Sequence, residues 1–113
     1  METWNNVMPQ YMKIKEVFVL EEAVDDLNEG RNFYDRKEAG VGDYFWDSLI
    51  ADIESLIIYA GIHSKRYGFC RIFAKRFPYA IYYEIIKNIA YIIAVLPMRR
   101  DPGWIKKKIQ DRI

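Results

Sequence analysis

A chain of 113 residues that is 51% hydrophobic and 29% charged has the composition of one globular domain, which excludes a disordered tail and a collagen-like repeat. Its one cysteine, Cys70, cannot form an internal disulfide and is interpreted as a small core residue in a reducing compartment. The net charge of +1 conceals an asymmetry, because residues 1–60 hold 5 Lys and Arg against 13 Asp and Glu, whereas residues 61–113 hold 12 against 3. This asymmetry predicts either a surface for an anionic partner or two halves that neutralise each other across the fold.

The N-terminus does not read as a secretory signal, and no apolar run is long enough to span a membrane, the longest being residues 89–96. We therefore expect a cytoplasmic protein with no membrane contact. Residues 1–12 are interpreted as an extended or frayed arm, in which Trp4 and Tyr11 could dock on the body. Residues 13–113 are expected to form a single domain.

The first regular elements are a strand and a helix. Residues 13–19 alternate weakly and are rich in β-branched side chains, which predicts a strand, and the lysines at its start suit an edge position. From Glu21 to near Ala39 apolar residues recur at spacings of three and four, with acidic residues on the opposite side, which predicts an amphipathic helix. Gly30 lies on the apolar face, where a second helix could approach closely.

A second helix follows after a short glycine-containing loop. Gly40 and Gly42 tolerate positive φ and end the first helix, and Asp43 is expected to cap the second. Apolar residues then continue at helical spacing until Gly61, which sits where a C-terminal cap is expected. Two amphipathic helices joined by a short loop predict an antiparallel helical hairpin.

The basic half of the chain contains three strand-like segments and a last short helix. The strand segments are residues 68–77, 79–86 and 89–96. Pro78 marks the turn between the first two, and Lys87-Asn88 is expected to form a two-residue hairpin loop. The last segment is apolar on both faces, which predicts a buried central strand. Asp101-Pro102 is a typical N-cap and first-turn pair for a short basic helix.

Aromatic rings and cations are mixed in the stretch from Phe69 to Tyr83. Strand alternation places Arg71 and Lys75 on one face with Phe69, Phe73 and Phe77, and we expect that face towards solvent or a partner. The other face, Cys70, Ile72 and Ala74, is small and apolar and is expected to pack against the helices. In the next strand Tyr79 and Tyr83 share one side and Tyr82 takes the other.

The order of elements and four short motifs together resemble the RelE/ParE superfamily of toxins from bacterial type II toxin-antitoxin systems, and most closely the ParE-like plasmid-stabilisation proteins. The motifs are RFPYAIYY at 76–83, AVL at 94–96, RRDP at 99–102 and WI at 104–105. The resemblance implies an α+β fold in which an N-terminal strand, an antiparallel helical hairpin and a short C-terminal helix combine with a mainly antiparallel sheet. It also implies a cognate antitoxin.

Members of the superfamily have one of two activities, and the residues at two positions of this chain favour one of these activities over the other. RelE-like members cut messenger RNA on the ribosome, whereas ParE-like members inhibit DNA gyrase. Nucleases of this family usually carry an Arg where this chain has Ala80, and commonly a His where it has Pro97, although Arg71 and Arg99 match family arginines. The resemblance therefore implies a gyrase inhibitor that is not an enzyme. The alternatives are a ribosome-dependent mRNA endoribonuclease and a degenerate, non-toxic relative that only binds a partner.

The candidate functional surface consists of basic and tyrosine side chains, and no catalytic residue is assigned. Its members are Arg71, Lys75, Arg76, Tyr79, Tyr83, Arg99 and Arg100, with Lys65, Trp104 and Lys107 as a secondary set. His63 is interpreted as a surface loop residue, and Glu84 as a carboxylate that orients an Arg. No Cys/His spacing suggests a metal and no Gly-rich loop suggests a nucleotide, so no cofactor is expected. The expected partners are the antitoxin and gyrase, or the ribosome and mRNA, in a homodimer or a toxin-antitoxin hetero-oligomer.

Overall fold

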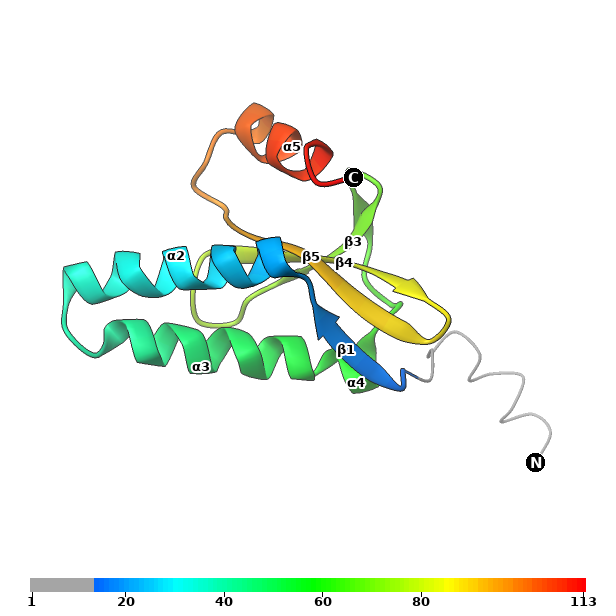
Figure 1. Cartoon of the computed structure of the whole chain (residues 1–113), viewed down its shortest axis with the longest axis horizontal. Helices are drawn as coiled ribbons and strands as arrows, with labels where there is room; N and C mark the ends of the chain where they lie inside the picture. The colour runs from blue at the N-terminus through cyan, green and yellow to red at the C-terminus, as the bar shows by residue number, and fades with distance from the viewer. Residues whose placement is uncertain (1–13) are drawn as a thin grey trace.

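The structure is a computed structural model that describes residues 14–113, so the arm expected at residues 1–12 lies outside the described residues (Figure 1). The elements follow the predicted order with two short additions, β2 and α4. In chain order they are β1 (Glu16–Val19), α2 (Glu21–Lys37), α3 (Val41–Glu54), α4 (Leu56–Tyr59), β2 (Lys65–Arg66), β3 (Phe69–Phe73), β4 (Tyr79–Ile86), β5 (Ile89–Pro97) and α5 (Pro102–Gln110). Among residues 14–113, no helix is long and apolar enough to cross a membrane.

The strands form one sheet in the order β1-β5-β4-β3-β2, in which β1 and β5 run parallel and the other neighbours run antiparallel. The predicted mainly antiparallel sheet, with its first strand at an edge, is therefore confirmed. The strand predicted to be central, β5, is buried between β1 and β4, although β4 is the middle strand of the five. Lys87 and Asn88 join these two strands with φ values of 50° and 67°, as a two-residue hairpin loop of type I′ requires.

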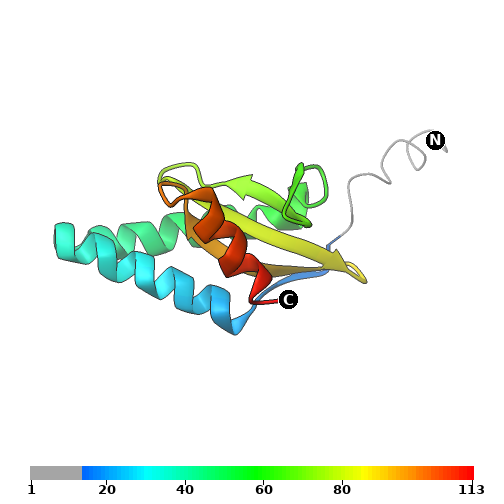
Figure 2. The same cartoon turned by 90° about the horizontal axis from the view of Figure 1, so that it is seen from above.

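The helices α2 and α3 form the predicted antiparallel hairpin, which packs on one face of the sheet (Figures 1 and 2). Gly30 of α2 faces the ring of Phe45 on α3, and a Cβ at residue 30 would overlap the ring atoms. The glycine on the apolar stripe thus allows the close approach that the sequence predicts. A helix interior would otherwise favour alanine.

The prediction that Asp43 caps the second helix is wrong. The helix begins two residues earlier, after Gly40 adopts a left-handed φ of 92°, so Asp43 falls in the first turn and pairs with Arg31 of α2 at 2.5 Å. A side chain from α2 does the capping instead, because the Asp35 carboxylate accepts a hydrogen bond from the Gly42 N–H at 2.8 Å. The connection is tight enough that the partner helix provides the acceptor.

The second predicted helix is also interrupted before Gly61. α3 ends at Glu54 and a single turn, α4, follows it. At the break, the Ser55 hydroxyl donates to the Asp52 carbonyl at 2.6 Å, a local bond of the kind that competes with helical pairing. Gly61 then follows the last turn with a φ of 94°, in agreement with its predicted role at a helix end.

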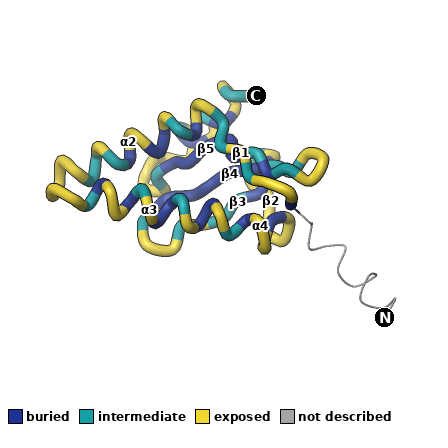
Figure 3. Tube along the Cα trace, turned by 60° about the horizontal axis from the view of Figure 1, so that its bottom comes forward, coloured by how far each residue is buried: buried dark blue, intermediate teal, exposed yellow. Residues whose placement is uncertain are grey.

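Two hydrophobic clusters lie on opposite faces of the sheet, whose central strands are the most deeply buried part of the fold (Figure 3). The larger cluster joins the helical hairpin to the sheet and includes Cys70, with Ile72 and Ala74 packed against it, as strand alternation predicts. The smaller cluster lies beneath α5, which crosses the other face (Figure 2).

The prediction that Phe69 and Phe77 lie on an open face is wrong for both residues. Phe69 is buried in the smaller cluster beneath Ile105 and Ile109 of α5, because that helix covers this end of the sheet. Phe77 packs on the hairpin side, 5.1 Å from the ring of Phe45. β3 ends at Phe73, so the alternation of that strand does not continue as far as residue 77.

A buried ion pair fastens the C-terminal end to α2. Arg112 binds the Asp26 carboxylate through two hydrogen bonds of 2.5 and 2.7 Å, and it also donates to the Ile93 carbonyl at 3.2 Å. The Val95 N–H of β5 donates to the same carboxylate at 2.9 Å. Asp26 raises the pKa of Arg112, against the effect of burial. One carboxylate therefore joins three parts of the chain that are far apart in sequence.

Candidate functional site

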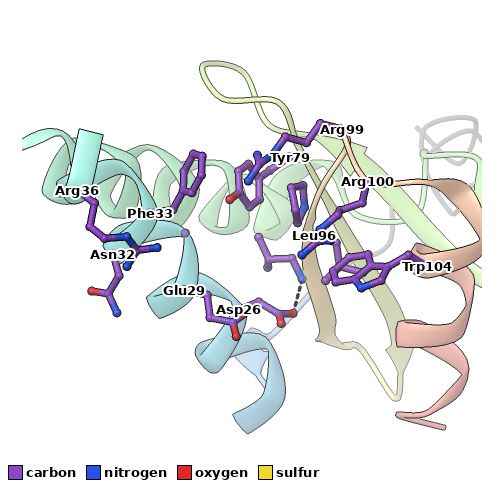
Figure 4. A pocket seen from close by; sticks show the side chains of 13 residues that line it. Asp26, Glu29, Asn32, Phe33, Arg36, Tyr79, Leu96, Arg99, Arg100 and Trp104 are labelled. Carbon is purple, nitrogen blue, oxygen red and sulfur yellow. Dashed lines mark hydrogen bonds between the residues drawn. The ribbon is translucent and has the colours of Figure 1, made fainter. Parts of the chain in front are cut away.

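A cleft of about 310 Å³ opens between α2, the end of β5 and the loop that leads into α5 (Figure 4). Four of the residues singled out in the sequence line it, namely Tyr79, Arg99, Arg100 and Trp104. The helix α2 provides the facing wall, which includes side chains that the sequence did not single out: Asp26, Glu29, Asn32, Phe33 and Arg36.

Two of the arginines lie over aromatic rings. The guanidinium of Arg99 is 4.3 Å from the ring centre of Phe33, and that of Arg100 is 4.3 Å from the ring centre of Trp104. Asp101 caps α5 as predicted, because its carboxylate accepts a hydrogen bond from the backbone N–H of Trp104 at 3.1 Å. Stacking restricts each guanidinium plane, so the donors are oriented before a partner arrives.

Tyr79 lies at the base of the cleft and is only 3% exposed. Burial raises the pKa of its phenol, against the lowering effect of the Arg99 guanidinium. The phenol therefore stays protonated at neutral pH and cannot act as a general base. In this position it supplies a protonated hydroxyl in the same cleft as Arg99.

The cleft presents positive charge that the described part of the protein does not neutralise by ion pairing. Ion pairs among residues 14–113 join Arg31 to Asp43, Lys107 to Asp111 and Arg112 to Asp26, and none includes a cleft arginine. The Asp26 carboxylate in the wall is occupied by Arg112 and the Val95 N–H. The arrangement suits an anionic partner, because three arginines line the cleft and only one exposed carboxylate, that of Glu29, lines it with them.

A second hollow, of about 170 Å³, lies on the α5 side of the sheet and shares Arg100 with the cleft. Arg71 lies in it with its guanidinium 4.7 Å from the ring centre of Phe73. Burial raises the pKa of Tyr82 in the same hollow, against the lowering effect of Arg71. Arg66 of β2 lines the same hollow. The basic side chains around both hollows form what we call the arginine surface: Arg36, Arg66, Arg71, Arg99 and Arg100.

The sequence missed two members of this surface. Arg36 belongs to the acidic half of the chain and is three positions after Phe33, so the two side chains lie on one side of α2. Nothing local in the sequence indicates that this side faces the loop after β5. Arg66 lies in β2, which pairs with β3 across a turn formed by the left-handed residues Tyr67 and Gly68. A two-residue strand is too short to leave a signal of alternation.

The other predicted residues lie elsewhere. Lys75 and Arg76 are exposed in the loop after β3, where the Lys75 N–H donates to Asp52 of α3 at 3.0 Å. Lys65 lines a separate hollow of about 440 Å³ with Cys70 and Glu84. Lys107 lies on the outer side of α5 and pairs with Asp111 at 3.5 Å.

Tyr83 is not a surface residue. It is fully buried on the hairpin side, where its hydroxyl accepts a hydrogen bond from the Gly61 N–H at 3.0 Å and lies 2.6 Å from Nδ1 of His63. Burial raises its pKa to about 12. The interpretation of His63 as a plain surface residue is therefore wrong as well: the ring is partly buried and hydrogen-bonded, and burial lowers its pKa.

The described residues contain no cluster of side chains that could bind a metal ion. Among residues 14–113, no group of three or more His, Cys, Asp or Glu side chains could hold a metal ion. Glu84, the carboxylate expected to orient an arginine, lines the hollow with Lys65 rather than the arginine surface. The chemistry available at the arginine surface is the binding of anions by oriented guanidiniums.

Comparison with solved structures supports the architecture. The chain is similar to a protein chain in a structure described as the chromosomal ParDE TA system from P. aeruginosa, with a TM-score of 0.69 and 13% sequence identity over 77% of this chain and 98% of that chain. At this level of identity the likeness establishes the fold, and it confirms the predicted α+β class. No family model matches the sequence, and a search of curated proteins gives no match.

Proposed function

We propose that this protein is the toxin of a type II toxin-antitoxin system, that it inhibits DNA gyrase in the manner of ParE-like proteins, and that a cognate antitoxin neutralises it. The observation that carries the proposal is the arginine surface on a fold similar to a chain of a ParDE system. Plasmid stabilisation, a bacterial cytoplasmic location and assembly with the antitoxin or as a homodimer belong to the same proposal.

The side chains around the arginine surface favour binding over catalysis. Cleavage of RNA requires a base for the 2′-hydroxyl and an acid for the leaving oxygen. The phenols here, Tyr79 and Tyr82, both have raised pKa values because they are buried, so neither ionises at neutral pH to serve as a base. Ala80 and Pro97 also lack the functional groups that nucleases of the resembled family usually carry at these positions.

The antitoxin is proposed to lay an acidic or amphipathic segment over this surface. Oriented guanidiniums suit carboxylates, and the aromatic side chains Phe33 and Trp104 offer apolar contact between the charges. A segment bound there would cover Arg99 and Arg100 together. That would explain neutralisation by occupation of the same surface that engages the target.

The experiment has two parts, toxicity and supercoiling. Expression of the chain alone is expected to arrest bacterial growth, and the purified protein is expected to reduce supercoiling of a relaxed plasmid by purified gyrase. Unchanged supercoiling at saturating protein would reject gyrase as the target. Unchanged growth on induction would favour the non-toxic relative that only binds a partner.

An endoribonuclease is the second candidate, favoured by the hollow that brings Arg66, Arg71 and Arg100 together on the sheet. Several guanidiniums around one hollow suit the phosphates of RNA. The discriminating measurement is a map of messenger 5′ ends after induction. New ends at ribosome-bound codons, lost on replacement of Arg71 by Ala, would support ribosome-dependent cleavage, whereas an unchanged map excludes it.

A further inference from the structure

The single turn α4 and the loop that follows it expose a cluster of large apolar side chains. Ten large hydrophobic residues are exposed in the described chain, and four of them fall within six consecutive positions. They are Ile57, Ile58, Tyr59 and Ile62, which are 43%, 65%, 51% and 50% exposed, and we call them the α4 patch. Single exposed apolar residues are ordinary, but a contiguous group marks an interaction site.

Helix geometry explains why these residues cannot turn inwards. Leu56 and Ala60 are four positions apart, point in the same direction and are fully buried in the larger hydrophobic cluster. The three residues between them must therefore face away from the core. An outward-facing helical turn normally carries polar side chains, whereas this chain has Ile-Ile-Tyr there.

The N-terminal segment enters the fold beside this patch. Ile14, the first described residue, is buried in the same cluster as Leu56 and Ala60, and α4 packs against β1 (Figure 1). The thirteen residues before Ile14 can extend roughly 43 to 47 Å, so they can reach the whole patch. That segment is itself rich in apolar residues and has two charged side chains, Glu2 and Lys13. Its large apolar members are Trp4, Val7, Met8, Tyr11 and Met12.

We propose that residues 1–13 bind back on the α4 patch of the same chain. Binding would then remove the apolar surfaces of the segment and of the patch from water together, and the burial of each lowers the free energy. The short tether gives the segment a high effective concentration at the patch, which favours this occupant over a second copy of the protein. The contact uses α4 and the following loop, and neither contributes a residue to the arginine surface, so it holds whether or not the protein is a gyrase inhibitor.

Hydrogen exchange on the full chain tests the proposal. The peptide that covers residues 56–62 is measured by mass spectrometry in the parent and in the variant Trp4→Ser/Tyr11→Ser. Exchange in the variant is expected to be faster by about tenfold. This ratio applies if the segment is docked in roughly nine of ten parent molecules, so that only about one in ten exchanges freely, and is released in the variant. The peptide over residues 36–42 reports on the connection between α2 and α3, at the opposite end of the molecule from β1 (Figure 1), and is expected to exchange equally in both proteins. Equal exchange at 56–62 would overturn the proposal.

A reciprocal substitution provides an independent test. Ile58→Arg is expected to increase the exposure of Trp4, which is measured as faster exchange of the peptide over residues 1–12. The control Tyr44→Arg, at an exposed apolar residue near the start of α3, is expected to leave that exchange unchanged. If protection at 56–62 falls on dilution of the parent, the occupant is a second copy and the intramolecular contact is rejected. Protection that is independent of concentration and lost in both test variants establishes it.

Discussion

Replacement of Gly30 by Ala tests the packing of the helical hairpin with the smallest change the chain allows. In an open helix this substitution stabilises by about 1 kcal/mol, because alanine has the higher helix propensity. Here the added Cβ would overlap ring atoms of Phe45, a side chain that is itself fully buried. Overpacking of a dense core costs about 1 to 3 kcal/mol. The overlap is severe, so we expect the upper part of that range and a net loss of about 1 to 2 kcal/mol.

Such a loss corresponds to a fall in melting temperature of roughly 4 to 10 °C for a domain of this size. Gly30→Leu is expected to cost more, since the longer side chain must separate α2 from α3. Gly103→Ala is the matched control, because residue 103 lies in the exposed first turn of α5 and a Cβ there meets nothing closer than 3.4 Å. It is expected to leave the melting temperature unchanged or slightly raised. If Gly30→Ala melts at or above the parent temperature, the proposed face of helix packing is wrong.

Three further predictions concern single side chains and their contacts in the structure. Arg112→Met leaves the buried Asp26 carboxylate without its cation and is expected to cost about 3 to 5 kcal/mol by urea unfolding at pH 7, and a cost below about 1 kcal/mol would contradict the buried pair. Asp101→Ala removes the cap of α5 and is expected to cost about 1 kcal/mol, whereas an unchanged urea midpoint would show that the cap contributes nothing. Because burial lowers the folded-state pKa of His63 below its unfolded value of about 6.5, the folded state binds its proton less readily, so this residue's contribution to stability is complete above that pH and declines below it. The parent is therefore expected to lose more stability between pH 7.5 and 5.5 than His63→Gln, and equal losses would exclude the effect.

Sequence reasoning succeeded where the information is local. The left-handed residues Lys87 and Asn88, the cap at Asp101 and the close approach at Gly30 all depend on chemistry within a few positions or on one helical face. The same holds for the inward orientation of Cys70, which follows from strand alternation. The α+β class then follows from the order of the elements.

The failures have a common physical cause, which is the placement of one element on another. Phe69 is covered because α5 crosses its face of the sheet, and strand alternation has no information on that crossing. Asp26 and Arg112 are 86 positions apart, so their pairing leaves no pattern in the sequence.

The candidate site was anticipated in part. Arg71, Arg99 and Arg100 were identified, and the structure brings them to adjoining hollows that share Arg100. Arg36 belongs to an acidic helix, and only the tertiary arrangement shows that it faces the same cleft. The sequence wrongly placed Tyr83 on the functional surface. A tyrosine in a half-buried strand and a tyrosine in a strand covered by helices have the same local sequence pattern, although only the first presents its ring to a partner.

The central claim is that the arginine surface engages DNA gyrase, and the most direct measurement compares three proteins in one supercoiling assay. Arg99→Ala/Arg100→Ala removes both stacked guanidiniums, and Lys106→Ala removes a charge from an exposed position on α5 that lines neither hollow. The parent and Lys106→Ala are expected to inhibit supercoiling equally, whereas the double variant is expected to need at least tenfold more protein at a melting temperature within about 3 °C of the parent. Equal inhibition by all three folded proteins, or no inhibition by the parent, would contradict the account.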